Sequence, residues 1–192
     1  MKKILAAATA LLAMAAVESS QAATFELSLS DTSIQSRLAA PVVEDDHGST
    51  EFNARLLYND RKRLSLASAG VEFITQPLAS GLGLGLGTEA LAGRKKSTTA
   101  NQDIYGLSVG ARLYYYPAEL AGWGFQAKLY YVPQITAFSD LDRLLETGAR
   151  VGYAASPTLE VFVEYQNIRA DFDRLGKQTI DDNLRVGFAA SF

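Results

Sequence analysis

The sequence predicts an all-β chain that folds as a closed, antiparallel, up-and-down transmembrane β-barrel of eight to ten strands. Apolar residues alternate with polar or small residues along most of the chain, the N-terminus has the pattern of an export signal, and the last predicted strand ends on an aromatic residue. Residues two apart lie on the same face of a strand, so this alternation indicates strands with one apolar face. No segment of comparable length has a convincing helical period.

The first 22 residues have the composition of a cleavable signal peptide. Two lysines follow Met1, an apolar run of 14 residues covers positions 4–17, and small residues precede a cleavage site after Ala22. The run is shorter than the ~20 residues that a membrane-spanning helix needs. We therefore expect residues 1–22 to be a signal peptide and residues 23–192 to form the barrel.

The composition beyond the predicted signal excludes several classes of function. Sixteen basic and 20 acidic residues give a net charge of −4, and this lack of a basic surplus argues against a nucleic-acid partner. The chain contains no cysteine and a single histidine. It therefore has no disulfides and no plausible set of metal ligands, and no cofactor is expected.

Eight strands can be placed by their alternation after residue 49. They are predicted at 50–58, 64–76, 81–91, 103–116, 123–134, 144–154, 158–169 and 180–192. Residues 25–38 form either a hairpin, with a turn at Asp31-Thr32-Ser33, or one further strand. Parity favours ten strands, because bacterial single-chain outer-membrane barrels have even strand numbers. Polar stretches such as "GRKKSTTANQ" are expected to be loops.

The placement of aromatic residues distinguishes a membrane barrel from a soluble β-sandwich, which also shows alternation. Tyrosines 114–116, Trp123 and Phe192 lie near predicted strand ends, as in the aromatic girdles at a membrane interface. Several predicted strands reach the ~10 residues that a tilted strand needs to cross a bilayer. These features favour a barrel whose apolar face meets lipid.

The C-terminal stretch "RVGFAASF" fits the sorting signal of outer-membrane barrels, with Arg185, Gly187, Ala190 and Phe192 at the expected positions. Together with the export signal, it predicts a location in the bacterial outer membrane. The expected partners are outer-membrane lipid, lipopolysaccharide and, during biogenesis, the barrel-assembly machinery.

Several stretches resemble the YfaZ-like family of small Gram-negative outer-membrane proteins. They are "RLLYNDRKRLSLASAGVEF", "GLGLGLGTEALAG", "YGLSVGARLYYYPAEL" and the closing "FVEYQNIRADFD…DDNLRVGFAASF". The chain is also similar, more broadly, to small barrels of the OmpX and OmpW kind. The resemblance implies the fold and the location, and it implies no catalytic residue.

The polar face of the strands is expected to line the lumen. Its charged members are predicted to be Glu51, Arg55, Glu72, Glu89, Arg112, Lys128, Arg150, Glu160, Glu164 and Arg185. Buried charges are costly unless they are paired, so five acids and five bases predict a salt-bridge network that fills a narrow interior.

A narrow channel for small solutes or ions is the other interpretation of this lumen. Its lining residues would be Glu89, Arg112, Lys128, Arg150, Glu164 and Arg185. Inward glycines at 81–87, 106, 110, 148 and 152 leave room for such a path, but they also suit positions where the wall bends or packs against a large neighbour.

Two polar stretches suggest further activities. His47 and Ser49 in "EDDHGSTE" are two residues apart and resemble the His-x-Ser of lipid A deacylase barrels, although the stretch is also typical of a hydrophilic turn. A lipid A-modifying esterase is therefore an alternative to a non-enzymatic barrel. Arg94, Lys95 and Lys96 could meet the phosphates of lipopolysaccharide in an adhesion or surface-interaction role.

Overall fold

The computed structural model describes residues 23–45, 48–75, 81–96, 101–173 and 175–192. The long strands are β1 (Thr24–Leu29), β2 (Ser33–Asp45), β3 (Gly48–Asn59), β4 (Leu64–Thr75), β5 (Leu82–Lys95), β6 (Gln102–Tyr115), β7 (Trp123–Val132), β9 (Leu141–Ser156), β10 (Leu159–Phe172) and β11 (Gly176–Ser191). A 3-10 turn, η1 (Gln134–Thr136), and the short strand β8 (Ala137–Ser139) connect β7 to β9. Within the described ranges, no helix has the length and apolar character needed to span a membrane.

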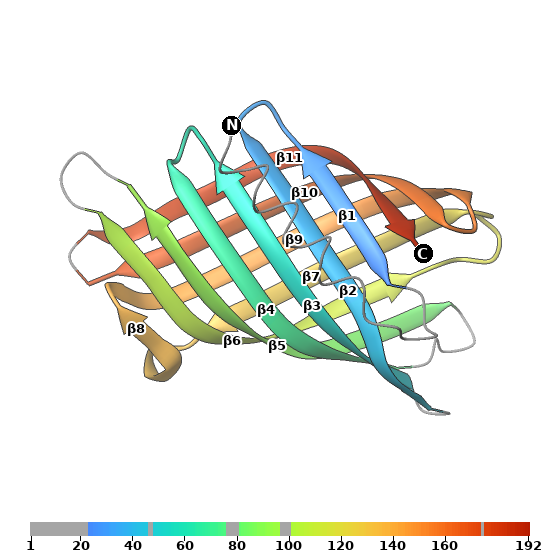
Figure 1. Cartoon of the computed structure of the whole chain (residues 1–192), viewed down its shortest axis with the longest axis horizontal. Helices are drawn as coiled ribbons and strands as arrows, with labels where there is room; N and C mark the ends of the chain where they lie inside the picture. Colours follow the sequence, from blue (N-terminus) through green and yellow to red (C-terminus); the bar gives the residue numbers. More distant parts are fainter. Residues whose placement is uncertain (1–22, 46–47, 76–80, 97–100, 174) are drawn as a thin grey trace.

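The ten long strands of the described chain close into an antiparallel ring. Each pairs with the next long strand along the chain, and β1 pairs with β11 to complete the circle (Figure 1). Ala23 and Phe192 exchange two backbone hydrogen bonds of 3.0 Å at this closure. The predicted closed up-and-down barrel is thus confirmed, and so are the preference for ten strands and the N-terminal hairpin.

The two ends of the barrel differ in what they carry. One end, which we call the terminal end, carries the chain termini and the β2–β3, β4–β5, β6–β7 and β9–β10 connections. The other end, which we call the loop end, carries the β1–β2, β3–β4, β5–β6, β7–β9 and β10–β11 connections. β8 pairs with Ile104–Gly106 of β6 and so extends the wall at the loop end beyond β7.

The wall is apolar outside and polar inside. On β6, Leu107 and Val109 are 47% and 58% exposed, whereas Ser108 between them is fully buried. The same alternation exposes Leu84 and Leu86 on β5. In water this arrangement would leave a large apolar surface unprotected, whereas in a bilayer it places the apolar side chains in lipid. The chain therefore has the architecture of a transmembrane barrel.

Two segments between predicted strands are partly strand, so the strands that flank them are longer than predicted. β5 continues to Lys95 and β6 begins at Gln102, so most of the flanks of "GRKKSTTANQ" belong to the wall. β10 likewise continues to Phe172, and β11 begins at Gly176. The sequence did not reveal these strand ends because their outward side chains are polar instead of apolar. Their partners across the ladder are also polar, as in the Arg94–Asp103 pair.

Inward glycines make room for large side chains from adjacent strands. A Cβ on Gly148 would lie 2.7 Å from Cε of Lys128, and one on Gly187 would lie 2.7 Å from Cζ of Phe162. Gly110 faces the ring of Tyr130 in the same way. These three glycines therefore do not leave an open path, because a neighbouring side chain fills the space beside each of them.

We expect Gly110→Ala to lower the free energy of unfolding by about 1–3 kcal/mol, the usual cost of overpacking. The added Cβ would lie 2.5 Å from the Leu129 carbonyl oxygen, which belongs to the wall and cannot move aside. Urea unfolding of the barrel in phospholipid vesicles, followed by fluorescence of the single tryptophan, Trp123, would measure the change.

Gly83→Ala is the matched control, because the nearest atoms to its added Cβ are 3.8 Å away. Equal stability of the two variants would contradict the close packing at Gly110.

Candidate functional site

The interior of the barrel is the candidate functional site, and it has three layers along the barrel axis. An apolar cluster lies at the loop end, a network of ion pairs fills the middle, and a polar vestibule opens at the terminal end. Each layer is built from inward side chains of most of the strands, so it depends on the closure of the ring.

The ion-pair network consists of two branches. In the first, Arg37 and Arg150 both contact Glu26, at 3.3 Å and 2.8 Å, and Arg150 also contacts Glu164 at 3.1 Å. Glu72 lies 3.5 Å from Arg112 and 3.9 Å from Arg37, which joins Arg112 to this branch. Ser28 and Gln35 donate hydrogen bonds to Glu164. The carboxylates are thus held by several donors each.

The second branch centres on Glu146, which lies 2.7 Å from the Lys128 ammonium and accepts two hydrogen bonds from Arg55. Arg55 also lies 3.6 Å from Glu89. The two branches together hold five acids and five bases, so the middle of the lumen has no net charge. This balance offsets the cost of removing ten charges from water.

Little free space remains in this layer. The cavity among Glu26, Arg37, Arg112, Lys128 and their neighbours has a volume of about 30 Å³, which is close to the volume of one water molecule in the liquid. Arg150 adds to the filling by stacking its guanidinium 3.7 Å from the centre of the Phe162 ring. The ion pairs therefore occupy the cross-section instead of lining an open path through it.

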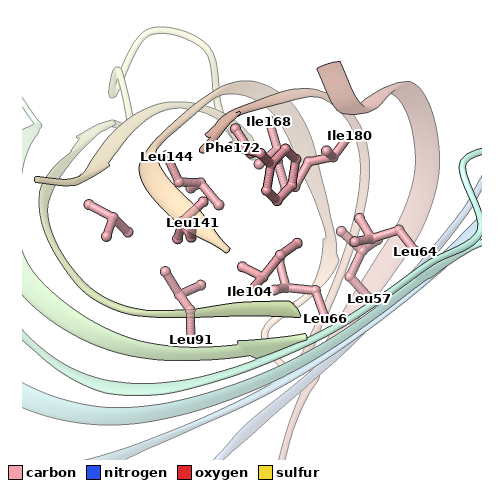
Figure 2. Close-up of a cluster of buried hydrophobic side chains, with 12 residues drawn as sticks. Leu57, Leu64, Leu66, Leu91, Ile104, Leu141, Leu144, Ile168, Phe172 and Ile180 are labelled. Atoms are coloured by element: carbon pink, nitrogen blue, oxygen red, sulfur yellow. The ribbon is translucent and has the colours of Figure 1, made fainter. Parts of the chain in front are cut away.

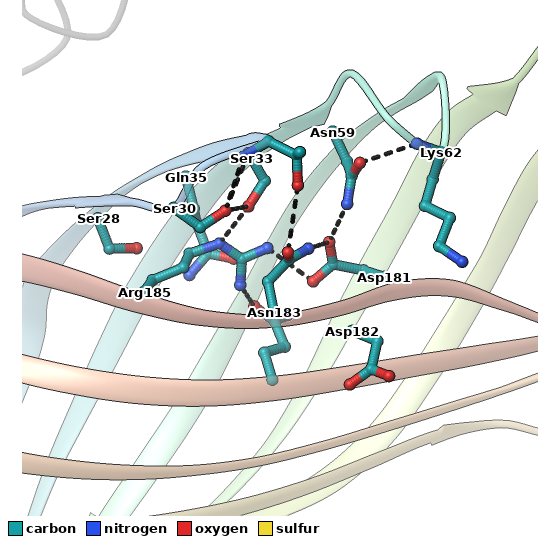
Figure 3. Close-up of polar contacts among 12 residues, drawn as sticks. Ser28, Ser30, Ser33, Gln35, Asn59, Lys62, Asp181, Asp182, Asn183 and Arg185 are labelled. Carbon is teal, nitrogen blue, oxygen red and sulfur yellow. Dashed lines mark hydrogen bonds and ion pairs between the residues drawn. The ribbon is translucent and has the colours of Figure 1, made fainter.

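A separate polar cluster forms around Arg185, which is fully buried (Figure 3). β1 ends at Leu29, opposite Val186, so β11 has no β1 partner from Arg185 toward the loop end. The Arg185 guanidinium donates to Ser33 on β2, Gln166 on β10 and Asp181 on β11, at 2.9, 2.9 and 2.6 Å. These side chains connect β11 to β2 where β1 is missing.

The apolar plug, as we call the cluster at the loop end, closes the lumen there (Figure 2). Its members are Leu57, Leu64, Leu66, Leu91, Ile104, Val132, Leu141, Leu144, Ile168, Ala170, Phe172 and Ile180, all at most 5% exposed. They come from eight of the strands, and Ala137 of β8 and Leu175 pack against them. The plug is a hydrophobic core inside a barrel whose outer surface is also apolar.

A polar vestibule at the terminal end continues into the lumen. It has a volume of about 270 Å³, and its lining includes Glu51, Glu160, Tyr114 and Tyr116. Glu26, Arg37, Gln126 and Arg150 line both the vestibule and the central cavity. The vestibule thus ends on the ion-pair network.

All the charged side chains predicted from the alternation to face inward do so. Glu89, Arg112, Lys128, Arg150 and Glu164 lie together in the network, and Arg185 lies in the cluster beside the plug. Sequence reasoning missed Glu26, Arg37 and Glu146. Each occupies an inward place in an alternating segment, so the period-two pattern at residues 25–38 and 144–154 could have identified them.

The predicted esterase pair lies only partly within the described residues. Ser49 lies near the start of β3, beside Glu51 and Asp45 in a hollow next to the vestibule. His47 lies outside the described residues. No group of three or more potential metal ligands occurs in the portion of the chain that is described.

No protein-family model matches the chain, and no curated protein matches it. Among solved structures, a KdgM porin is 13% identical with a TM-score of 0.44, covering 89% of this chain and 99% of that chain. A NanC porin is 10% identical with a TM-score of 0.46, covering 90% and 99%. The chain is thus distantly similar to small porins, and its function is inferred below from its own residues.

We expect Glu146→Gln to destabilise the barrel by about 3–5 kcal/mol, because it leaves Arg55 and Lys128 buried without their shared carboxylate. Urea unfolding in vesicles would measure this loss. Asp103→Asn is the control, since it removes the exposed partner of Arg94 and should change stability little. A change at Glu146 no larger than that at Asp103 would show that the network does not stabilise the interior.

Proposed function

We propose that this chain is a small, non-enzymatic outer-membrane barrel whose lumen is sealed near the loop end. In this role the barrel acts through its outer wall and its two ends, which contact lipid or other molecules, and it does not pass solutes freely. The apolar plug is the observation that carries this proposal. Membership of the YfaZ-like family remains a prediction from the sequence resemblance.

The chemistry of the plug supports a seal. Leu64, Ile104, Val132, Ile168 and Ile180 are fully buried, so no water contacts them in this state. Burying such a side chain is worth ~1.5–3 kcal/mol, so exposing four of them to water would cost on the order of 6–12 kcal/mol. An apolar constriction of this kind excludes ions by remaining dry.

The number of strands supports an orientation for the barrel. If an exported chain inserts from the periplasm, an even number of strands leaves both termini on that side. The terminal end and its vestibule would then face the periplasm, and the plug would lie toward the outer leaflet. In this orientation the vestibule is a polar chamber that is open to the periplasm and closed above.

A narrow channel is the second candidate, and a specific observation favours it. Glu26, Arg37, Gln126 and Arg150 line both the vestibule and the central cavity, so polar side chains continue from the terminal end into the middle of the barrel. The plug interrupts this polar column, and the ion-pair network narrows it to a cavity of about 30 Å³. Opening of the plug, together with side-chain movement in the network, would therefore convert the sealed barrel into a pore.

We expect the purified, heat-modifiable wild-type barrel to show no discrete openings in a planar bilayer. Ile104→Ser combined with Leu144→Ser should produce openings, because two hydroxyls allow water into the plug. Ile104→Val with Leu144→Val is the matched control and should stay silent. Reproducible openings of the wild type would overturn the sealed barrel and support the channel.

The pore-lining role of the network can be tested in the serine variant. Adding Arg112→Gln and Arg150→Gln removes two positive charges from a balanced lumen, so the reversal potential in a salt gradient should shift toward cation preference. Arg143→Gln with Arg169→Gln, at the loop end, should leave it unchanged. An unchanged reversal potential in the first variant would show that ions do not pass the network.

A further inference from the structure

The fold joins two basic triplets that are separate in the sequence. Residues 61–63 form the turn between β3 and β4, and residues 94–96 end β5. Ser65 pairs with Arg94 across the β4–β5 ladder, and the Lys96 amide donates to the Arg63 carbonyl at 3.0 Å. Six cationic side chains therefore belong to neighbouring strand ends at the loop end, and we call them the cationic patch.

Half of the patch is not neutralised by the chain. Arg61 pairs with Asp31 at 2.8 Å, and Arg94 pairs with Asp103. Lys95 donates to the uncharged Gln178. Among the described residues, no carboxylate lies within ion-pair distance of the Lys62, Arg63 or Lys96 side chains. Arg63 and Lys96 are available to an external anion, and Lys62 can contact one as well, although it also attracts the Asp182 carboxylate.

Apart from Arg94, which belongs to the cationic patch, the lipid-facing wall next to the patch carries only small side chains. Ser65, Ala67 and Ala69 of β4 face outward and pair with Arg94, Ala92 and Ala90 of β5. Larger outward residues stand on both sides, with Tyr58 on β3 and Tyr105 on β6, 38% and 43% exposed. The result is a shallow strip, two strands wide, that leads along the wall to the cationic patch.

We propose that the cationic patch and the alanine strip bind the phosphorylated glycolipid of the outer leaflet, lipopolysaccharide. Its lipid A phosphates would contact Lys62, Arg63 and Lys96, and its acyl chains would lie along the strip. Lysine and arginine form strong charge-assisted contacts with phosphate. The inference rests on the orientation proposed above, which places the loop end in the outer leaflet.

The surplus of positive charge is local to the cationic patch. The described bases outside the lumen all lie at the loop end, but an equal number of acids lies there too, namely the aspartates at positions 31, 60, 103, 140, 142, 171, 173, 181 and 182. Other loop-end bases, such as Arg143 and Arg169, lie on β9 and β10, on the opposite side of the ring. They provide a matched set of charges without the alanine strip.

Native mass spectrometry of the detergent-purified barrel with bisphosphorylated lipid A would test the proposal. We expect Lys62→Gln, Arg63→Asn and Lys96→Gln together to weaken lipid A binding by about tenfold or more. Asparagine is chosen at position 63 because Arg63 has a φ of 50°, which asparagine tolerates. The triple variant Arg143→Gln, Arg169→Gln, Lys177→Gln should bind within about twofold of wild type.

Several outcomes would overturn the proposal. They are no lipid A binding by the folded wild type, equal losses in both triple variants, or equally tight binding of phosphatidylglycerol. Competition by inorganic phosphate alone, with no effect of Ala90→Phe, would indicate a phosphate site without a glycolipid. A wild type that conducts yet binds lipid A through the patch would overturn only the sealed barrel.

Discussion

Closure of the hydrogen-bonded ring is the constraint on which the rest of the barrel depends. An unpaired backbone N–H or C=O costs several kcal/mol in lipid, so each strand of the wall needs a partner on both sides. The β1–β11 pairing supplies the last partner, and it fixes the circumference at ten strands. β1 is only six residues long, so its end leaves a gap beside the sixteen-residue β11. The buried Arg185 cluster occupies this gap, where side-chain hydrogen bonds to β2 connect strands that have no ladder between them.

Closure also creates an interior that must be filled, and two kinds of side chain fill it, charged in the middle and apolar at the loop end. Charged side chains suit the middle because acids and bases are interspersed around the ring, so that each carboxylate meets a guanidinium or an ammonium. Such pairs contribute little net stability, but they are strongly destabilising when one partner is lost. Leucine and isoleucine fill the loop end, where the strands extend beyond the network and the buried charges of Arg185 and Asp181 pair with each other. Glycines on the inward face allow large side chains from neighbouring strands to pack directly against the wall, as Lys128 does against Gly148.

The alternation of apolar and polar residues was enough to predict the fold and the inward face of most strands. Each strand has one face in lipid, so its pattern can be recognised from the local sequence alone. The contacts within the lumen were not predictable in the same way. Glu26 meets Arg150 across 124 positions of sequence, and only the closing β1–β11 pairing brings β1 to that side of the barrel. The plug was missed for a different reason. Its leucines and isoleucines share the inward face with charged residues, so composition along a strand does not show that they gather at one end. The joining of residues 61–63 with 94–96 likewise depends on the β4–β5 register.

The interior of the barrel changes from polar to apolar along its axis. At the terminal end, charged and tyrosine side chains line a vestibule that stops at the ion-pair network. At the loop end, the apolar plug fills the lumen. A solute pore requires a continuous polar column, whereas this interior is polar on one side and apolar on the other. The plug therefore separates the polar vestibule from the loop end, so the cationic patch and the vestibule do not share a water-filled path through the barrel.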